Sequence, residues 1–145
     1  MFKLGEVKPP NDQDYDYVKN LCVNHAEWDL EVSKANLQIW VKNNSLSTFR
    51  MIKIKADLEN VNANNLFDVL LDGDYGRVWD TNMIESTQVC YLSPCSDINY
   101  YAMKSPKPLK NRDFVVQRCW LDFGEGNEKL VFNHSVNHAV SYIFK

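Results

Sequence analysis

The sequence predicts an α+β fold built on an antiparallel sheet, because strand-like segments follow one another with few helices between them. Apolar and polar residues alternate, with the period of two typical of half-buried strands, in residues 28–33, 37–41 and 51–58. Four further strands are predicted at about residues 83–92, 98–104, 113–121 and 130–137. Strands that run in series, without a helix after each one, favour the α+β class over a parallel α/β sheet.

The alternation also assigns the side chains of the first three strands to two faces. The residues predicted to be buried or to face a cavity are Trp28, Leu30, Val32, Ile52, Ile54, Ala56 and Leu58. The residues predicted to lie on the opposite side are Asp29, Glu31, Lys53 and Lys55. A shift of one residue in register would exchange the two faces.

Three short helical segments are predicted between or before the strands. Asn11 is a suitable N-cap for a helix that runs to about His25, with acidic residues in its first turn. Asn62 is predicted to cap a second helix that ends near Gly73, which is expected at the C′ position. A short helical turn is expected around residues 75–81, and a turn at residues 124–127 joins the last two strands.

Composition indicates one ordinary domain and excludes several classes of protein. The chain has 145 residues, 45% of them hydrophobic, with a net charge of -3 and an isoelectric point near 5.6. A nucleic-acid-binding domain usually carries a basic stripe and a high isoelectric point, so nucleic acid is not an expected partner. The sequence contains no signal peptide or transmembrane segment, which favours the cytosol. Its four cysteines are expected to be reduced there, since their spacing fits neither a zinc knuckle nor a redox pair.

The motifs of common enzymes and metal sites are missing from the sequence. His134 and His138 have a spacing that binds zinc on a helix, but their surroundings predict a strand, in which four residues separate them by roughly 13 Å. The Trp79-Asp80 pair lacks the repeats of a propeller, and Gly124 and Gly126 lack the rest of a dinucleotide-binding motif. Because no acid–base group is singled out either, the sequence predicts a protein without catalytic activity, metal or cofactor.

Three motifs resemble the START (StAR-related lipid transfer) domain, in the subgroup of the phosphatidylcholine transfer proteins. They are Tyr75–Asp80, Lys107–Asp113 and Phe132–His138. The resemblance covers about residues 11–138 and implies that residues 1–10 are a tail and 11–145 a START domain. It also implies a helix-grip fold, in which a curved antiparallel sheet wraps a long C-terminal helix and one lipid lies between them. No covalent chemistry follows, since the cavity only keeps the lipid's methylenes out of water.

The resemblance also implies candidate lipid-binding residues. In phospholipid-binding relatives, an arginine after the tyrosine of the first motif contacts the lipid phosphate and is paired with the aspartate of that motif. This chain has Gly76 at the arginine position, and the nearby cation is Arg77, one residue later. The headgroup candidates are therefore Arg77, Trp79, Asp80 and Arg112. Trp79 is expected to be buried or near the cavity, and Asp80 to pair locally with Arg77 or Arg112.

A basic, proline-containing loop precedes the strand at residues 113–121. Its candidate residues for contact with an anionic membrane are Lys104, Lys107 and Lys110, with Arg112 beside them. Such a charge run is often no more than a solvated surface. Alternatively, each cation near an anionic bilayer contributes about 1 kcal/mol to a transient attraction.

The C-terminal end departs from the family pattern. After His138 the relatives continue through a loop, further strands and the closing helix, whereas residues 139–143 here resemble a piece of the next strand. The resemblance thus predicts an incomplete domain without its closing helix. The first hypothesis is a cytoplasmic protein, peripheral to membranes, that carries phosphatidylcholine or phosphatidylethanolamine with reduced activity. The second is an interaction fragment that binds a partner through its uncovered sheet, and an enzyme on a related scaffold is a third.

Overall fold

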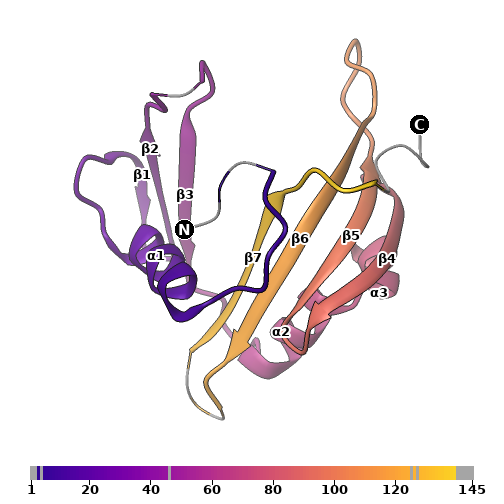
Figure 1. Ribbon diagram of the computed structural model, residues 1–145. Helices are drawn as coiled ribbons and strands as arrows, with labels where there is room; N and C mark the ends of the chain where they lie inside the picture. The colour runs from indigo at the N-terminus through magenta and orange to yellow at the C-terminus, as the bar shows by residue number, and fades with distance from the viewer. Residues whose placement is uncertain (1–2, 4, 46, 125, 127, 140–145) are drawn as a thin grey trace. The chain divides into compact units, whose positions relative to one another are not determined.

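The computed structural model describes residues 3, 5–45, 47–124, 126 and 128–139 (Figure 1). These residues form three helices and seven strands, which confirms the predicted α+β class. In chain order the elements are α1 (Asp12–Val23), β1 (Asp29–Lys34), β2 (Leu37–Lys42), β3 (Met51–Ala56), α2 (Ala63–Leu71), α3 (Gly73–Trp79), β4 (Met83–Ser93), β5 (Ser96–Met103), β6 (Arg112–Asp122) and β7 (Lys129–Ser135).

The strands form two antiparallel sheets, which belong to two compact units of the chain. Strands β1, β2 and β3 form a three-stranded sheet in the unit of residues 16–61. Strands β4 to β7 form a four-stranded meander in the unit that contains residues 1–15 and 62–145. Helix α1 therefore crosses the boundary between the units, whereas α2 and α3 belong to the second unit.

Side-chain caps start the helices at the predicted places. The Asn11 side chain accepts a hydrogen bond from the Asp14 N–H at 3.1 Å, and Asp14 accepts one in return from the Asn11 N–H at 3.2 Å. Asn62 caps α2 by accepting a hydrogen bond from the Asn64 N–H at 2.8 Å. Gly73 lies at the predicted C′ position, directly after the C-cap Asp72 of α2. It lacks a positive φ, because it is also the first residue of α3.

In the three-stranded sheet, the alternation along β3 is confirmed but the predicted burial is wrong. Ile52 and Ile54 pair with Val41 and Ile39, whereas Lys53 pairs with Trp40, so the aliphatic and lysine side chains lie on opposite faces. Ile52 and Ile54 are nevertheless 66% and 63% exposed. The physical reason is the position of the segment after α1, which covers the lysine face instead: Lys53 donates a 2.6 Å hydrogen bond to the Asn24 carbonyl.

The first strand contains a bulge that overturns the predicted faces of two residues. Leu30 pairs with Trp40 and Val32 pairs with the next residue of β2, Ile39, so Leu30 and Val32 lie on opposite faces. Leu30 is thus on the lysine face and half exposed. Trp28 is also on the lysine face, where the Lys53 ammonium lies 4.2 Å from the centre of its ring.

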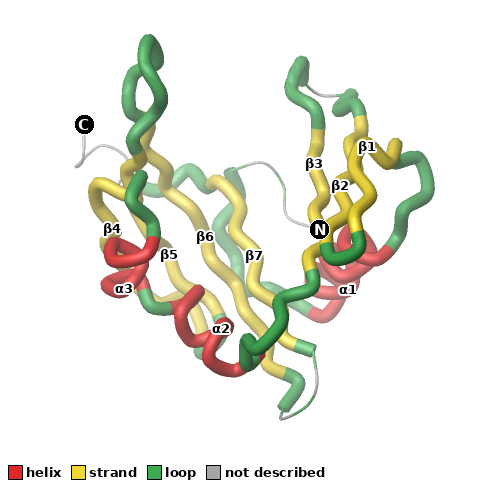
Figure 2. Tube along the Cα trace, turned by 180° about the vertical axis from the view of Figure 1, so that it is seen from behind, coloured by secondary structure: helices red, strands yellow, loops and turns green. Residues whose placement is uncertain are grey.

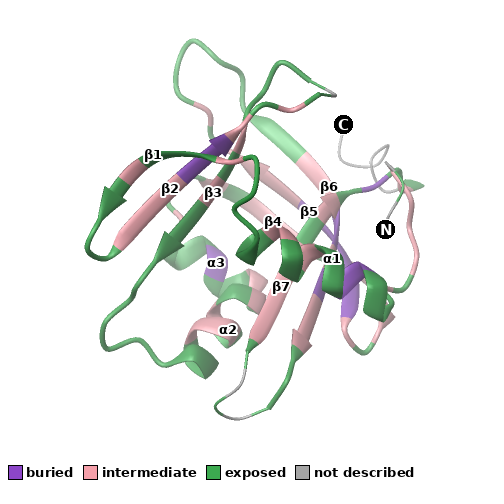
Figure 3. Ribbon diagram, turned by 90° about the vertical axis from the view of Figure 1, so that its left-hand side faces the viewer, coloured by how far each residue is buried: buried purple, intermediate pink, exposed green. Residues whose placement is uncertain are grey.

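Of the other residues predicted for these strands, some have the predicted environment and others do not. Leu58 and Ala56 are exposed rather than buried. Lys55 lies on the lysine face, as predicted, and Glu31 falls in the bulge. Asp29 pairs with Val41 and so lies on the face of Ile52, which is opposite to the prediction. The buried side chains of β2 are instead Trp40 and Val41, at the end of the strand coloured as buried in Figure 3. His25 stacks on Trp40 with ring centres 4.1 Å apart.

The four-stranded sheet has its main core on the face that we call the outer face, which carries Ile98, Gln117 and Cys119. All three side chains are fully buried. Ile98 pairs with Gln117 across β5 and β6, so the two share this face. Tyr15 of α1 packs edge-on against Phe132 with ring centres 5.7 Å apart, and its hydroxyl donates to the Trp120 carbonyl at 3.0 Å.

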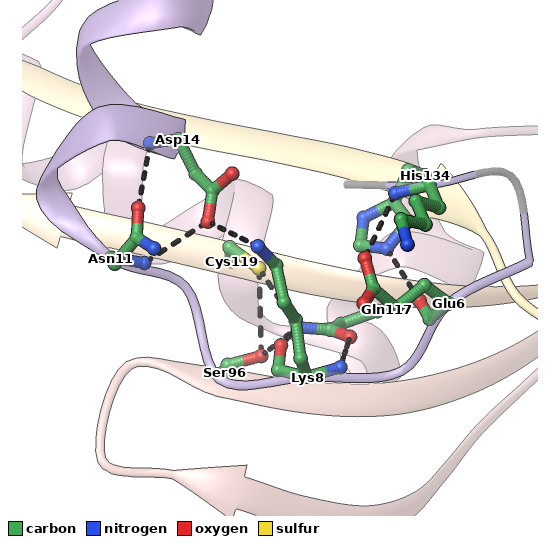
Figure 4. A network of polar contacts seen from close by, with 9 residues as sticks. Glu6, Lys8, Asn11, Asp14, Ser96, Gln117, Cys119 and His134 are labelled. Carbon is green, nitrogen blue, oxygen red and sulfur yellow. Dashed lines mark hydrogen bonds and ion pairs between the residues drawn. The ribbon is translucent and has the colours of Figure 1, made fainter. Parts of the chain in front are cut away.

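Residues 5–8, which we call the N-terminal strap, are hydrogen-bonded to the outer face (Figure 4). The Gln117 carboxamide accepts from the Lys8 N–H at 3.2 Å and donates to the Lys8 carbonyl at 2.6 Å. The Asn137 N–H donates to the Gly5 carbonyl at 3.0 Å, and His134 Nε2 lies 3.1 Å from the Glu6 carbonyl. The strap therefore satisfies polar groups that would otherwise be buried without partners.

Two further sequence predictions concern the last part of the chain. Gly124 and Gly126 have positive φ values of 99° and 73°, as the predicted turn between β6 and β7 requires. Among the described residues, no long helix follows β7, which ends at Ser135. Of the piece that resembles a further strand, residues 140–143 lie outside the described residues. None of the described helices has the length and apolar character needed to cross a bilayer.

Candidate functional site

Two adjoining pockets lie on the inner face of the four-stranded sheet, opposite the outer face. Helices α2 and α3 lie along this sheet, as the view from behind shows (Figure 2). The first pocket, which we call the apolar pocket, has a volume of about 230 Å³. Its apolar lining includes Val69, Leu70, Trp79, Met83, Met103 and Val116.

The second pocket, which we call the polar pocket, has a similar volume of about 230 Å³. It is lined by Asp74, Gln88 and Tyr91, among others. Both pockets share Asp72, Gly73, Ser86, Asn99 and Arg118. An apolar compartment and a polar one thus meet at a common wall, an arrangement suited to an amphipathic ligand.

Arg118 and Asp97 form a buried ion pair at this common wall. The two residues face each other across β6 and β5, and their contact is bidentate: Nη2 to Oδ2 at 2.7 Å and Nε to Oδ1 at 3.2 Å. Asp97 is fully buried, and the side chain of Arg118 is 13% exposed. A buried carboxylate requires such a partner, because removing an unpaired charge from water is costly.

Asp97 has its hydrogen-bonding capacity filled by its neighbours. Besides the two hydrogen bonds from Arg118, it accepts one from Gln88 at 2.6 Å and one from Asn99 at 2.5 Å. Arg118 uses a third N–H to donate to the Leu71 carbonyl at 2.7 Å. A guanidinium has five N–H donors, so two remain for a polar group that enters the pockets. Arg118 is the cation that lines both pockets among the described residues.

The structure brings two of the four predicted headgroup residues to the apolar pocket. Trp79 and Asp80 both line it, although Trp79 is 50% exposed and so is not buried as a core residue would be. Asp80 makes a local hydrogen bond, in which it accepts from the Asn82 N–H at 2.9 Å. The predicted pairing of Asp80 with Arg77 or Arg112 is wrong for the described contacts.

Arg77 and Arg112 line neither pocket. The Arg77 guanidinium donates to the Ser86 carbonyl at 2.6 Å, which fastens α3 to β4. Gly76, at the position where the resemblance expects an arginine, is buried and lines the apolar pocket. A Cβ placed there would lie 3.4 Å from the Met83 sulfur, which is an ordinary van der Waals contact.

The predicted membrane-contact residues lie in the loop between β5 and β6. Lys104, Lys107 and Lys110 are exposed, and so are Arg112 and Leu109 beside them. Lys104 Nζ lies 3.4 Å from the Thr81 carbonyl. The loop lines neither pocket, so its cations are available to an external surface.

Burial changes the pKa of two side chains of the four-stranded sheet, one on each face. Burial raises the pKa of Tyr101, which lines the apolar pocket, so its phenol remains neutral near pH 7. Burial also raises the pKa of Cys119, which keeps this thiol from being a reactive thiolate. Among the described residues, no group of His, Cys, Asp and Glu is arranged to hold a metal ion.

Comparisons with known proteins place these features in context. The model of the START domain family matches residues 11–141. START domain-containing protein 10 of mouse is 37% identical over 133 residues, which are 91% of this chain and 45% of that protein. Human phosphatidylcholine transfer protein is 28% identical over 107 residues, which are 72% of this chain and 48% of that protein.

The fold agrees with these sequence matches. A crystal structure of human STARD10 superposes with a TM-score of 0.83 at 36% identity, covering 92% of this chain and 54% of that one. The chain thus spans about half the length of the curated relatives that it matches.

Proposed function

Because this chain belongs to the START domain family, we propose that it binds one phospholipid without chemical change and carries it between membranes. The observation that carries the proposal is the contact between the apolar and polar pockets at Arg118. A lipid has the same division into an apolar and a polar part. The names of two relatives, a phosphatidylcholine transfer protein and a StAR-related lipid transfer protein, support this ligand class.

The size of the pockets limits which part of the lipid they hold. Each measures about 230 Å³, below the roughly 300–1,000 Å³ of pockets that enclose a whole small ligand. We therefore assign to them the headgroup, the glycerol and the first methylenes of the acyl chains. Every methylene kept from water contributes about 0.8 kcal/mol, so acyl chains that stay partly exposed lower the affinity sharply.

We propose that a headgroup phosphate lies at the common wall of the pockets. Arg118 offers two N–H donors that have no partner among the described residues, and the neighbouring Asp97 holds the guanidinium plane in place. Trp79 and Asp80 remain part of this proposed site as lining residues. A net-neutral phosphatidylcholine or phosphatidylethanolamine suits a site whose own ion pair is already neutral.

Lipid capture from vesicles tests the proposal directly. The purified chain is incubated with vesicles of phosphatidylcholine and phosphatidylethanolamine, re-isolated, and analysed for bound lipid by mass spectrometry. Leu70→Arg places a charge in the lining of the apolar pocket and should abolish capture. Val78→Arg is the matched control, because Val78 is 68% exposed on α3 and does not line the pockets. Equal capture by both variants would exclude the pocket as the lipid site.

The proposed carrier is cytoplasmic, and it binds peripherally to a membrane surface through its basic loop. Replacing Lys104, Lys107 and Lys110 by alanine should remove about 3 kcal/mol of attraction, or roughly a hundredfold in affinity for vesicles with anionic lipid. Replacing the exposed lysines Lys3, Lys34 and Lys55 is the matched control, with the same loss of charge elsewhere. Vesicle flotation at two salt concentrations measures the difference, and equal losses for the two triple variants would exclude the loop.

A second candidate function is binding of a protein partner without lipid transfer. The observation in its favour is the aliphatic face of the three-stranded sheet, where Ile52 and Ile54 are 66% and 63% exposed. Ile54→Lys should then remove a partner recovered by cross-linking, while lipid capture stays unchanged. If Ile54→Lys recovers the same cross-linked partner as the unchanged chain, this face is not the interface.

A further inference from the structure

Helix α2 forms part of the wall of both pockets. Val69 and Leu70 of α2 line the apolar pocket, and Leu71 lines the polar pocket. A lipid cannot reach the common wall at Arg118 through the space that α2 occupies. The attachment of this helix therefore decides how easily that side of the pockets opens.

The packing of α2 is weak for a helix that closes a pocket. Among its residues none is buried, and Leu70 is 46% exposed. Its nine residues are fewer than an isolated helix needs for stability in water, so its position depends on contacts to the sheet. Elements with few buried apolar contacts are those that open locally at the lowest free energy.

Two cationic side chains of the sheet hold α2 in place. Arg118 of β6 donates to the carbonyl of Leu71, the last residue of α2, where helix carbonyls lack partners within the helix. Lys129 of β7 places its ammonium 5.2 Å from the centre of the Phe67 ring. The side chain of Lys129 is only 9% exposed and is fixed by a 2.5 Å ion pair with Asp122.

The C-terminal end of α2 has the features of a hinge. Asp72 caps the C-terminus of α2 with its backbone N–H and the N-terminus of α3 with its side chain, and its own backbone is extended, with φ −77° and ψ 97°. Such a residue allows α2 to change direction while α3 stays helical and attached through Arg77 to β4. Hinges of this kind lie at the ends of elements.

We propose that α2 is the gate of the pockets, closed by Arg118 and Lys129, and that the lipid enters when α2 lifts from β6 and β7. The proposal rests on the proposed lipid-binding function. It assigns to Lys129 the role of holding α2 closed. This role is separate from lipid contact, because Lys129 lines neither the apolar nor the polar pocket.

The test combines hydrogen exchange with the rate of lipid uptake. In Lys129→Met, the amides of residues 63–71 should exchange about fivefold faster, the loss expected for one cation–π contact, while β5 and β6 stay unchanged. Uptake of a fluorescent phosphatidylcholine from quenched vesicles should become faster by a similar factor. Phe67→Leu removes the ring but keeps an apolar side chain, and it should act in the same direction if Lys129→Met fails to fold.

A variant that is expected to slow hydrogen exchange and lipid uptake, rather than speed them, strengthens the test. Asn64 lies with Lys129 in one surface groove that already contains Asp68 and Asp122, so Asn64→Glu adds a third carboxylate to the groove and should slow both exchange and uptake. Asn65→Glu is the matched control, since it adds the same charge to the first turn of α2 without lining that groove.

Three results would overturn the gate. In the first, residues 63–71 exchange equally in Lys129→Met, Phe67→Leu and the unchanged chain. In the second, exchange becomes faster but lipid is taken up at the same rate, which leaves the lipid-binding function intact. In the third, no form of the chain takes up lipid, and the proposed function fails together with the gate.

Discussion

The ion pair of Arg118 and Asp97 allows a quantitative prediction. Arg118→Met removes the cation and leaves the fully buried Asp97 carboxylate with two neutral donors, Gln88 and Asn99. Removing one partner of a buried pair costs about 3–5 kcal/mol, against about 0–1 kcal/mol for a pair at the surface. With 13% of the arginine side chain exposed, the pair lies near the buried limit.

A double-mutant cycle separates the pair from the other contacts of Arg118. The hydrogen bond to Leu71 is lost in Arg118→Met whether or not Asp97 is changed, so its contribution cancels in the cycle. In the double variant with Asp97→Asn, no charge is left buried, and the combined cost should be about 2 kcal/mol below the sum of the single costs. Urea unfolding followed by tryptophan fluorescence gives these free energies of unfolding. Additive costs would refute the assignment of Arg118 and Asp97 as a coupled buried pair.

Three further predictions concern the outer face. Burial alone would raise the pKa of Asp14, but the hydrogen bonds from Asn11 and Lys8 bring this pKa below its ordinary value. Asp14 therefore stabilises the fold above about pH 4. Asp14→Asn should lower the free energy of unfolding at pH 7, and this loss should shrink as the pH falls through the lowered pKa of Asp14. Unfolding curves measured from pH 7 to 2 test this. Tyr15→Phe should cost about 1 kcal/mol in urea unfolding, because only the hydroxyl bond is lost, and a cost near zero would show that water replaces it. Gly5→Ala should lower the melting temperature, since φ is +77° and the new Cβ would lie 2.3 Å from the Asn137 side chain, and an unchanged melting temperature would contradict this strain.

The sequence predicted the positions of the helices and strands better than it predicted which of their side chains are buried. Period-two alternation located β1, β2 and β3, and side-chain caps located the starts of α1 and α2. Alternation does not reveal a bulge, because the extra residue between Leu30 and Val32 leaves the pattern of residue types unchanged. Nor does it state which face is covered: Ile54 has the pattern of a core residue and is exposed.

The candidate site was predicted only in part, for a related reason. Trp79 and Asp80 could be named because they belong to a local motif, and both line the apolar pocket. Arg118 was missed because its pairing with Asp97, 21 positions earlier in the chain, depends on the register of β5 against β6, and the intervening residues carry no signal of that register. A cation and an acid inside two strands that are otherwise buried are nevertheless a usable signal, since unpaired charges are rare in such strands.

The anchor of the N-terminal strap has a consequence for how this end of the chain can vary. Gln117 binds the N–H and the carbonyl of Lys8, groups that every residue except proline possesses, so this contact places no demand on the side chain at position 8. The demand falls on position 117 instead. Asparagine carries the same carboxamide but is one methylene shorter. A substitution at position 8 other than proline therefore leaves this anchor intact, whereas a substitution of Gln117 removes it.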